Sequence, residues 1–292
     1  MLNLIASDLY RITRPRGLRG SIWQYGIALL AAYALVVGLM MFAKSQTFAD
    51  LAGGHSATMP SDFASYTAYM ASMMSGIVPL CASFMAVENA QQDFKNGYVK
   101  SVLTARVGRL SYILGKVLFA GVVSALVVAL AAVIVFVGTA AAGFTFASMD
   151  SLAGLVGWFA GFWLNAWALS VLSLVLVYAM RSAPVSYLGA VFLYSGFVPQ
   201  LLRWLAHSSG GILRFLEPAA PVLETLAAWM PTSALSNLES GGSLFFKNAA
   251  AVWGPASRAF VINPGVQAVL TGLIWIVFAA AVVLAISRKR DI

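Results

Sequence analysis

The sequence predicts an all-α membrane protein with six transmembrane helices. Of its 292 residues, 61% are hydrophobic and 10% are charged, and the mean hydropathy is +0.86, whereas roughly a quarter of the residues of a soluble domain are charged. A hydrocarbon core of about 30 Å is crossed by about 20 helical residues. Apolar runs of that length lie at residues 24–43, 66–87, 112–139, 152–180, 185–205 and 264–286. We therefore expect a single membrane domain over residues 1–292.

The positions of the basic residues predict that both termini face the cytoplasm. Lys and Arg in short loops stay on the cytoplasmic side. With the N-terminus inside, most basic residues fall in cytoplasmic segments, namely 11–19, 95–116, 181 and 288–290. The net charge of +8 is thus gathered at span ends, where it suits anionic lipid headgroups and argues against nucleic acid. We expect a multi-pass protein of the cell membrane, in a bacterium the inner membrane.

Residues 1–20, ahead of the first span, are predicted to form an interfacial helix. Leu2, Ile5, Leu9 and Ile12 recur at spacings of three and four, which is the pattern of an amphipathic helix lying on a membrane surface. A frayed tail with chance periodicity is the alternative. The apolar run that follows is too long for the h-region of a cleaved signal peptide, so we expect the first span to be retained.

The second and fourth spans carry side-chain patterns of their own. Tyrosine and methionine side chains form a stripe at helical spacing on the second span. Such a surface adapts well to varied apolar ligands, so it is a candidate wall of a substrate path; simple core packing is the alternative. Gly154, Gly157 and Gly161 give the fourth span a small-residue face for close helix contact. Cys81 is expected to pack inside the second span. The candidate path residues are Tyr66, Tyr69, Met70, Met73 and Met74.

The segment 88–109, between the second and third spans, is basic and helix-forming. Residues 89–95 can form a short polar helix, Gly97 suits its C-terminal cap, and Val99 and Leu103 give the next turn an apolar face beside Lys100. Such a helix on the membrane surface would fit the groove of a soluble partner. The alternative is an ordinary loop kept basic for topology.

The external segment 206–262 separates the last two spans and is too apolar for a linker that is fully exposed to water. Its most apolar stretch, 212–230, is not expected to span, because each charge near a helix centre costs about 2.5–3.5 kcal/mol and prolines interrupt helical hydrogen bonds. We expect short helices that cap the outer leaflet, either as a lid over an exit path or as a static cover. The interrupting residues are Arg214, Glu217, Pro218, Pro221 and Glu224.

No catalytic or metal-binding pattern is visible in the sequence. It has no phosphate-binding loop, no His-Glu-x-x-His pair and no nucleophile elbow. His55 and His207 have no second ligand at metal spacing. The spans also lack the central charges and paired broken helices by which secondary transporters use ion gradients. We therefore expect a non-enzymatic protein whose energy comes from a partner.

The sequence resembles the permease subunits of type-2 ATP-binding-cassette (ABC) exporters. The matching pattern is Asp93-Phe94, then Gly97 and Lys100, then Arg109, and finally Tyr112-x-x-x-Lys116 at the start of the third span. The interfacial helix, the six spans with both ends inside and the long final external loop are also similar to that family.

The resemblance implies a membrane subunit of a transporter without chemistry of its own. A coupling helix within 89–104 would dock on cytoplasmic ATPase subunits, which bind ATP and Mg²⁺, through Asp93, Phe94, Gly97, Val99, Lys100 and Leu103. Arg109 and Lys116 would anchor the third span at the lipid phosphates. A second permease subunit, identical or homologous, would complete the path for a hydrophobic or amphipathic substrate, such as a peptide antibiotic or a lipid-like compound. A gradient-driven carrier and a non-transporting scaffold or immunity protein remain as alternatives.

Overall fold

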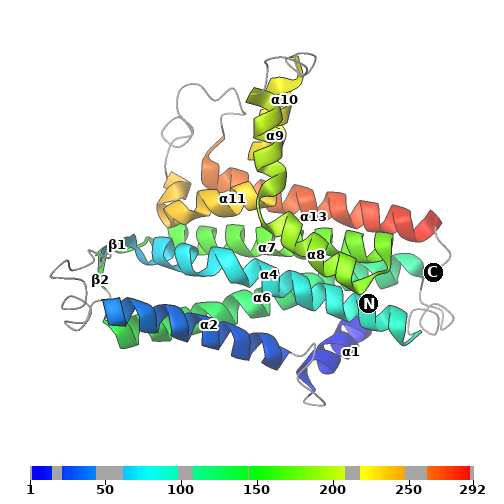
Figure 1. Ribbon diagram of the computed structural model, residues 1–292, viewed down its shortest axis with the longest axis horizontal. Helices are drawn as coiled ribbons and strands as arrows, with labels where there is room; N and C mark the ends of the chain where they lie inside the picture. Colours follow the sequence, from blue (N-terminus) through cyan, green and yellow to red (C-terminus); the bar gives the residue numbers. More distant parts are fainter. Residues whose placement is uncertain are drawn as a thin grey trace.

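Five long helices, roughly side by side, form the body of the protein (Figure 1). The computed structural model describes residues 2–14, 22–43, 62–97, 108–143, 145–207, 218–246 and 262–289. The long helices are α2 (Ile22–Ala43), α4 (Tyr66–Lys95), α6 (Arg109–Ala142), α7 (Leu152–Met180) and α13 (Pro264–Lys289). Both chain termini lie at one end of this bundle, here called the α1 end after helix α1 (Leu2–Thr13) (Figure 1).

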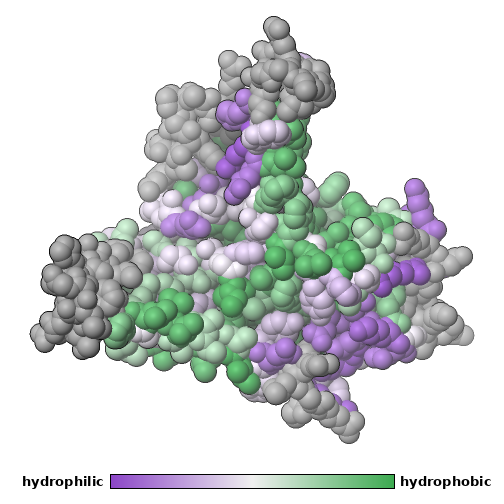
Figure 2. Space-filling model, in the orientation of Figure 1, coloured by the Kyte–Doolittle hydropathy of each residue, from purple (hydrophilic) through white to green (hydrophobic). Residues whose placement is uncertain are grey.

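The long helices have the length and composition of membrane spans, as the sequence predicted. All five are long and apolar enough to cross a bilayer. They expose large apolar side chains, among them Leu35 at 65%, Phe136 at 61% and Val277 at 69%, and Figure 2 shows much of the bundle surface as hydrophobic. Such a surface is unusual for a soluble protein and fits contact with lipid tails. The chain is a helical protein of the multi-pass membrane class.

The predicted fifth span, 185–205, is broken. It consists of α8 (Ala183–Tyr194) and α9 (Phe197–His207), which meet at an angle of 55°. Gly196 in the break has a φ of +69°, a conformation that glycine adopts without steric cost. The apolar run is continuous, so hydropathy alone could not reveal this bend. The bent pair would be the sixth span if it crosses as one unit.

Residues 89–95 form the last two turns of α4, not the separate surface helix that the sequence predicted. The apolar run ends near Val87, but the helix continues to Lys95 because its polar side chains find partners inside the bundle. Gly97 follows the end of α4 with a φ of +64°, in line with its predicted role at the helix C-terminus. The next described helix, α6, begins at Arg109.

Two short strands at the other end of the bundle were not predicted. Strand β1 (Asp62–Ser65) pairs in parallel with β2 (Thr145–Ser148); this end is called the β1 end below. Nearby, both oxygens of the Asp150 carboxylate accept hydrogen bonds from Thr67, at 2.8 Å from the backbone N and 2.6 Å from the hydroxyl. An acceptor with negative charge at the first turn of α4 stabilises the helix N-terminus.

Small residues on α7 allow close packing within the chain, as predicted. A Cβ atom at Gly154 would lie 3.1 Å from the backbone oxygen of Gly242, and one at Gly157 would lie 3.0 Å from the Phe245 ring. One turn beyond Gly161, the buried Asn165 amide donates to the Ala268 oxygen of α13 at 2.8 Å. The fourth predicted span is therefore the central helix, in contact with both α4 and α13.

The described part of the predicted external segment consists of short helices, not a further span. They are α10 (Ala220–Ala228), α11 (Pro231–Asn237) and the 3₁₀ turns η2 (Leu238–Ser240) and η3 (Gly242–Phe246). Helices α9 and α10 pack together and project from the bundle, while α11 returns along α7 and α13 (Figure 1). Pro221 and Pro231 lie in the first turns of α10 and α11, where proline needs no hydrogen bond.

Candidate functional site

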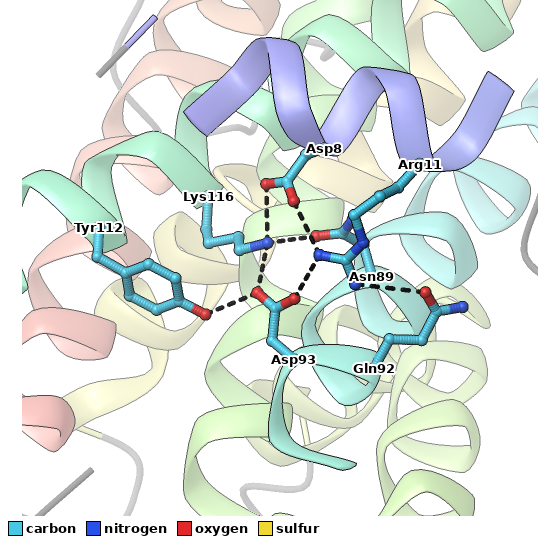
Figure 3. A network of polar contacts seen from close by, with 7 residues as sticks. All are labelled: Asp8, Arg11, Asn89, Gln92, Asp93, Tyr112 and Lys116. Carbon is cyan, nitrogen blue, oxygen red and sulfur yellow. Dashed lines mark hydrogen bonds and ion pairs between the residues drawn. The ribbon is translucent and has the colours of Figure 1, made fainter. Parts of the chain in front are cut away.

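A cluster of polar side chains joins three helices at the α1 end of the bundle. We call it the polar cluster (Figure 3). Helix α1 lies across the ends of α4 and α6 and contributes two charged residues, while each of the other helices places its members one helical turn apart. The members are Asp8 and Arg11 from α1, Asn89, Gln92 and Asp93 from α4, and Tyr112 and Lys116 from α6.

Lys116 lies at the centre of the polar cluster. Its side chain is 4% exposed, and its ammonium contacts three oxygens, at 2.8 Å from Asp8, 2.6 Å from Asp93 and 2.6 Å from Asn89. An ammonium group has three N–H donors, so these partners satisfy all of them. The lysine thereby holds α1 and α4 against α6.

Asp93 is the acceptor that all three helices share. It is fully buried, and its carboxylate accepts from Arg11 at 2.6 Å and from the Tyr112 hydroxyl at 2.8 Å as well as from Lys116. Arg11 also reaches Asp8 at 3.2 Å. Two cations and two anions balance, so the buried cluster carries no net charge. Removing one partner of such a group is costly, about 3–5 kcal/mol, because it leaves an uncompensated buried charge.

Three of the residues predicted to contact an ATPase lie in the described part of the chain. Asp93 is inside the polar cluster. Phe94 is partly buried, with its ring 5.3 Å from that of Tyr178 and 5.9 Å from the guanidinium of Arg181, at the end of α7. Gly97 is exposed just beyond α4. Val99, Lys100 and Leu103 lie outside the described residues.

The two predicted membrane anchors differ in their surroundings. Arg109 is exposed at the first residue of α6. Lys116, two turns further on, directs its ammonium into the polar cluster, where Asp8 and Asp93 neutralise it. The prediction that a lysine at this depth reaches the lipid phosphates assumed that no carboxylate lay nearer. The position of Asp8 on α1 supplies that carboxylate.

The predicted substrate-path stripe is largely packed inside the bundle. Tyr69, Met70 and Met74 are fully buried in the main hydrophobic core, and Tyr66 and Met73 are partly buried against it. Tyr66 makes edge contacts with the rings of Phe136 and Phe146, at 6.2 and 5.6 Å between centroids. This arrangement is that of the alternative, simple core packing. Cys81 is likewise buried, as expected.

A polar cavity of about 740 Å³ lies beside the break between α8 and α9. Its walls come from the α8–α9 turn, α9, α10, α11 and η2, and most of the lining side chains are polar. Figure 2 shows the hydrophilic residues gathered in the angle between α9 and the α11 side of the bundle, while the opposite side of α9 is hydrophobic. This site was not predicted from the sequence, because its residues come from three separate stretches: Ser75, residues 194–207 and residues 224–239.

A hydrogen bond links the break to the proline of α4. In a regular helix the Ser75 carbonyl would accept from the backbone N–H of residue 79, but Pro79 has none. The Tyr194 hydroxyl, at the end of α8, donates to that carbonyl instead. The end of α8 is thus fixed to the middle of α4.

No group of three or more metal-binding side chains occurs among the described residues. His207 is an exposed residue at the end of α9, with its Nε2 atom 3.7 Å from the Glu224 carboxylate; His55 lies outside the described part of the chain. The polar cluster also holds no nucleophile beside a general base. Its chemistry is electrostatic attachment between helices.

Asp8, Asn89 and Gln92 are cluster members for which the sequence predicted no role of their own, and Arg11 was predicted only as part of the cytoplasmic basic segment 11–19. A signal for them exists: Asp8 and Arg11 are three residues apart, and Asn89 precedes Asp93 by one helical turn, as Tyr112 precedes Lys116. Comparison with known protein families finds no family model that matches the chain, and no curated protein matches it. The fold and the two sites therefore define the class, a multi-pass helical membrane protein, and its function has to be inferred from them.

Proposed function

We propose that this chain is the membrane subunit of an ATP-driven exporter of the type-2 ABC kind, moved by a separate cytoplasmic ATPase that acts on the segment between α4 and α6. A second permease subunit would complete the translocation path. The observation that carries the proposal is the polar cluster, which ties both ends of that segment and helix α1 into one unit.

The attachment points lie directly beside the segment. Asp93 is two residues from the end of α4, and Tyr112 and Lys116 lie in the first two turns of α6. Their contacts of 2.6–2.8 Å join the two helix ends. A force applied between Gly97 and Gly108 therefore acts on α1, α4 and α6 together.

Within this proposal, the residues of the resemblance have two different roles. Asp93, Tyr112 and Lys116 transmit the movement, since they lie inside the bundle. Contact with the ATPase falls to the exposed Lys95 and Gly97 and to Val99, Lys100 and Leu103. Phe94 passes the movement to α7 through Tyr178. The transported molecule would be hydrophobic or amphipathic, and Tyr66 and Met73 are the stripe members that it would meet with the least repacking.

The test replaces residues 98–103 with a Gly/Ser linker of equal length, which leaves the polar cluster and Gly97 intact. The tagged protein is extracted from its native membrane, and co-purified ATPase is measured by mass spectrometry and by ATP hydrolysis. We expect the wild type to retain an ATPase and the linker variant to lose it. A linker of the same length at 208–213 is the matched control and should retain it. If the wild type brings no ATPase, or the 98–103 variant retains a full amount, the proposal is wrong.

A second candidate is a gradient-driven carrier, which the broken α8–α9 pair favours. Discontinuous helices that line a polar cavity are a common feature of secondary transporters, and the cavity here is lined by Arg203, His207, Glu224 and Glu239. A carrier would transport in reconstituted vesicles that hold no ATPase and would stop when the proton and sodium gradients are collapsed.

A further inference from the structure

We propose that the cavity beside the α8–α9 break binds a zwitterionic molecule, which carries both an ammonium and an anionic carboxylate or phosphate. A short peptide with free ends and the phosphatidylethanolamine headgroup both have this chemistry. The site goes beyond the proposed function, because the ligand needs only this chain and no ATPase in order to bind. Binding can thus be measured without any ATPase, and its failure would leave the coupling proposal standing.

The cavity has the size and position of a ligand site. Its volume of about 740 Å³ lies within the range of about 300–1,000 Å³ that is usual for small-molecule pockets. It opens along the polar side of α9 (Figure 2). Ser75 of α4 and Tyr194 of α8 reach its inner wall, so it begins at the bundle and extends outward between α9 and α10.

Two charges of opposite sign line the cavity without an ion partner among the described residues. Arg203 on α9 makes one hydrogen bond, at 3.4 Å to the neutral Ser233 hydroxyl. Glu239 on η2 makes no hydrogen bond or ion pair in the described part of the chain, and no described salt bridge joins it to Arg203. Both residues are exposed, so within the described part of the chain the guanidinium is available to an anion and the carboxylate to an ammonium.

Further polar groups on the wall favour the same ligand. The break places Gly196 and Pro199, in the first turn of α9, against the cavity, and the N-terminus of a helix carries partial positive charge. That charge adds to Arg203 in attracting an anionic group.

Other classes of ligand fit less well. A purely apolar molecule would cover Arg203 and Glu239 without pairing them, which is costly. A purely anionic one would approach both Glu239 and Glu224, and a purely cationic one would approach Arg203. Glu224 faces His207 at 3.7 Å near the outer end of α9, so Glu239 is the carboxylate that remains for an ammonium.

The experiment measures binding of tetraalanine to the full-length protein in detergent by calorimetry. Three blocked forms, N-acetylated, C-amidated and doubly blocked, remove one or both charges. Retention of phosphatidylethanolamine against phosphatidylglycerol is measured in parallel by native mass spectrometry. The variants are Arg203→Gln and Glu239→Gln, with the exposed Lys289→Gln as a matched control, and thermal unfolding verifies that each variant is folded.

We expect blocking either end of the peptide to weaken binding about ten-fold, because each end makes a charge-assisted contact. Arg203→Gln should weaken binding of the free peptide by a similar factor and leave binding of the C-amidated peptide unchanged. Glu239→Gln should also weaken binding of the free peptide, but it should leave binding of the N-acetylated peptide unchanged. Binding of tetraalanine alone would identify a soluble ligand, and selective retention of phosphatidylethanolamine alone would identify a lipid headgroup. If the charged and doubly blocked peptides bind equally and neither lipid is preferred, or if both variants bind as the wild type does, the proposal is overturned.

Discussion

Lys116→Met tests the polar cluster directly. The substitution removes the central cation and leaves the carboxylates of Asp8 and Asp93 buried with Arg11 as their only cation among the described residues. Breaking a buried charge group of this kind costs about 3–5 kcal/mol. A chain of this size loses roughly 2–4 °C of unfolding midpoint per kcal/mol, so we expect the midpoint to fall by roughly 6 °C or more. The assay is thermal unfolding in detergent, followed by circular dichroism.

A control and a double variant separate charge pairing from general damage. Lys95→Met removes an exposed lysine from the end of the neighbouring helix and should change stability by less than about 0.5 kcal/mol. The double variant Lys116→Met with Asp93→Asn keeps a neutral pair, Asp8 with Arg11. It should lose less than the sum of the single variants, by about 0.5–3 kcal/mol. Additive losses, or equal effects of Lys116→Met and Lys95→Met, would refute the direct contact.

Three further predictions concern contacts between the helices. Tyr194→Phe removes the donor to the Ser75 carbonyl and should lower the free energy of unfolding by about 1–3 kcal/mol. In a Pro79→Ala background, residue 79 regains an N–H that can bond to the same carbonyl, so the loss should be smaller. Equal losses in both backgrounds would count against the shared carbonyl. Gly121→Ala places a Cβ 2.6 Å from the Trp167 ring and should cost about 1–3 kcal/mol, whereas Gly38→Ala, with no atom within 4 Å, should be neutral or stabilising in the same unfolding assay. Asp150→Ala removes the acceptor at the start of α4 and should lower the free energy of unfolding by about 1 kcal/mol. Faster hydrogen exchange confined to the first turn of α4 would verify the cap. Unchanged exchange there would argue against it.

The long helices could be predicted because each is an uninterrupted apolar run of bilayer length. The prediction of 152–180 agrees with α7 residue for residue, since Ser151 caps its start and Arg181 ends it in a left-handed conformation. The break in the fifth predicted span could not be seen in the same way. Both α8 and α9 are apolar, and the groups that stabilise the break, such as the Ser75 carbonyl, lie far away in the sequence.

The candidate sites show the same limit. Asp93 and Lys116 were recognised as a matched pattern, but a sequence does not show which side of a helix end is covered. The burial of both residues depends on α1, whose Asp8 lies 108 positions from Lys116. The cavity is harder still to predict, because Arg203 lies in the predicted fifth span, 185–205, and Glu239 in the predicted external segment, 206–262. Pairings between distant segments are therefore where the structure adds most.

The helix ends at Gly97 and Gly108 are joined through Asp93, Tyr112 and Lys116, so contacts among the described residues hold α4 and α6 together at the α1 end. For a flexible connection, doubling the length costs only about 0.6 kcal/mol. Under the proposed function, the segment between them contacts a partner, and its sequence can then change while these contacts stay in place. A foreign docking sequence grafted between Gly97 and Gly108 would therefore leave the Asp93, Tyr112 and Lys116 contacts intact.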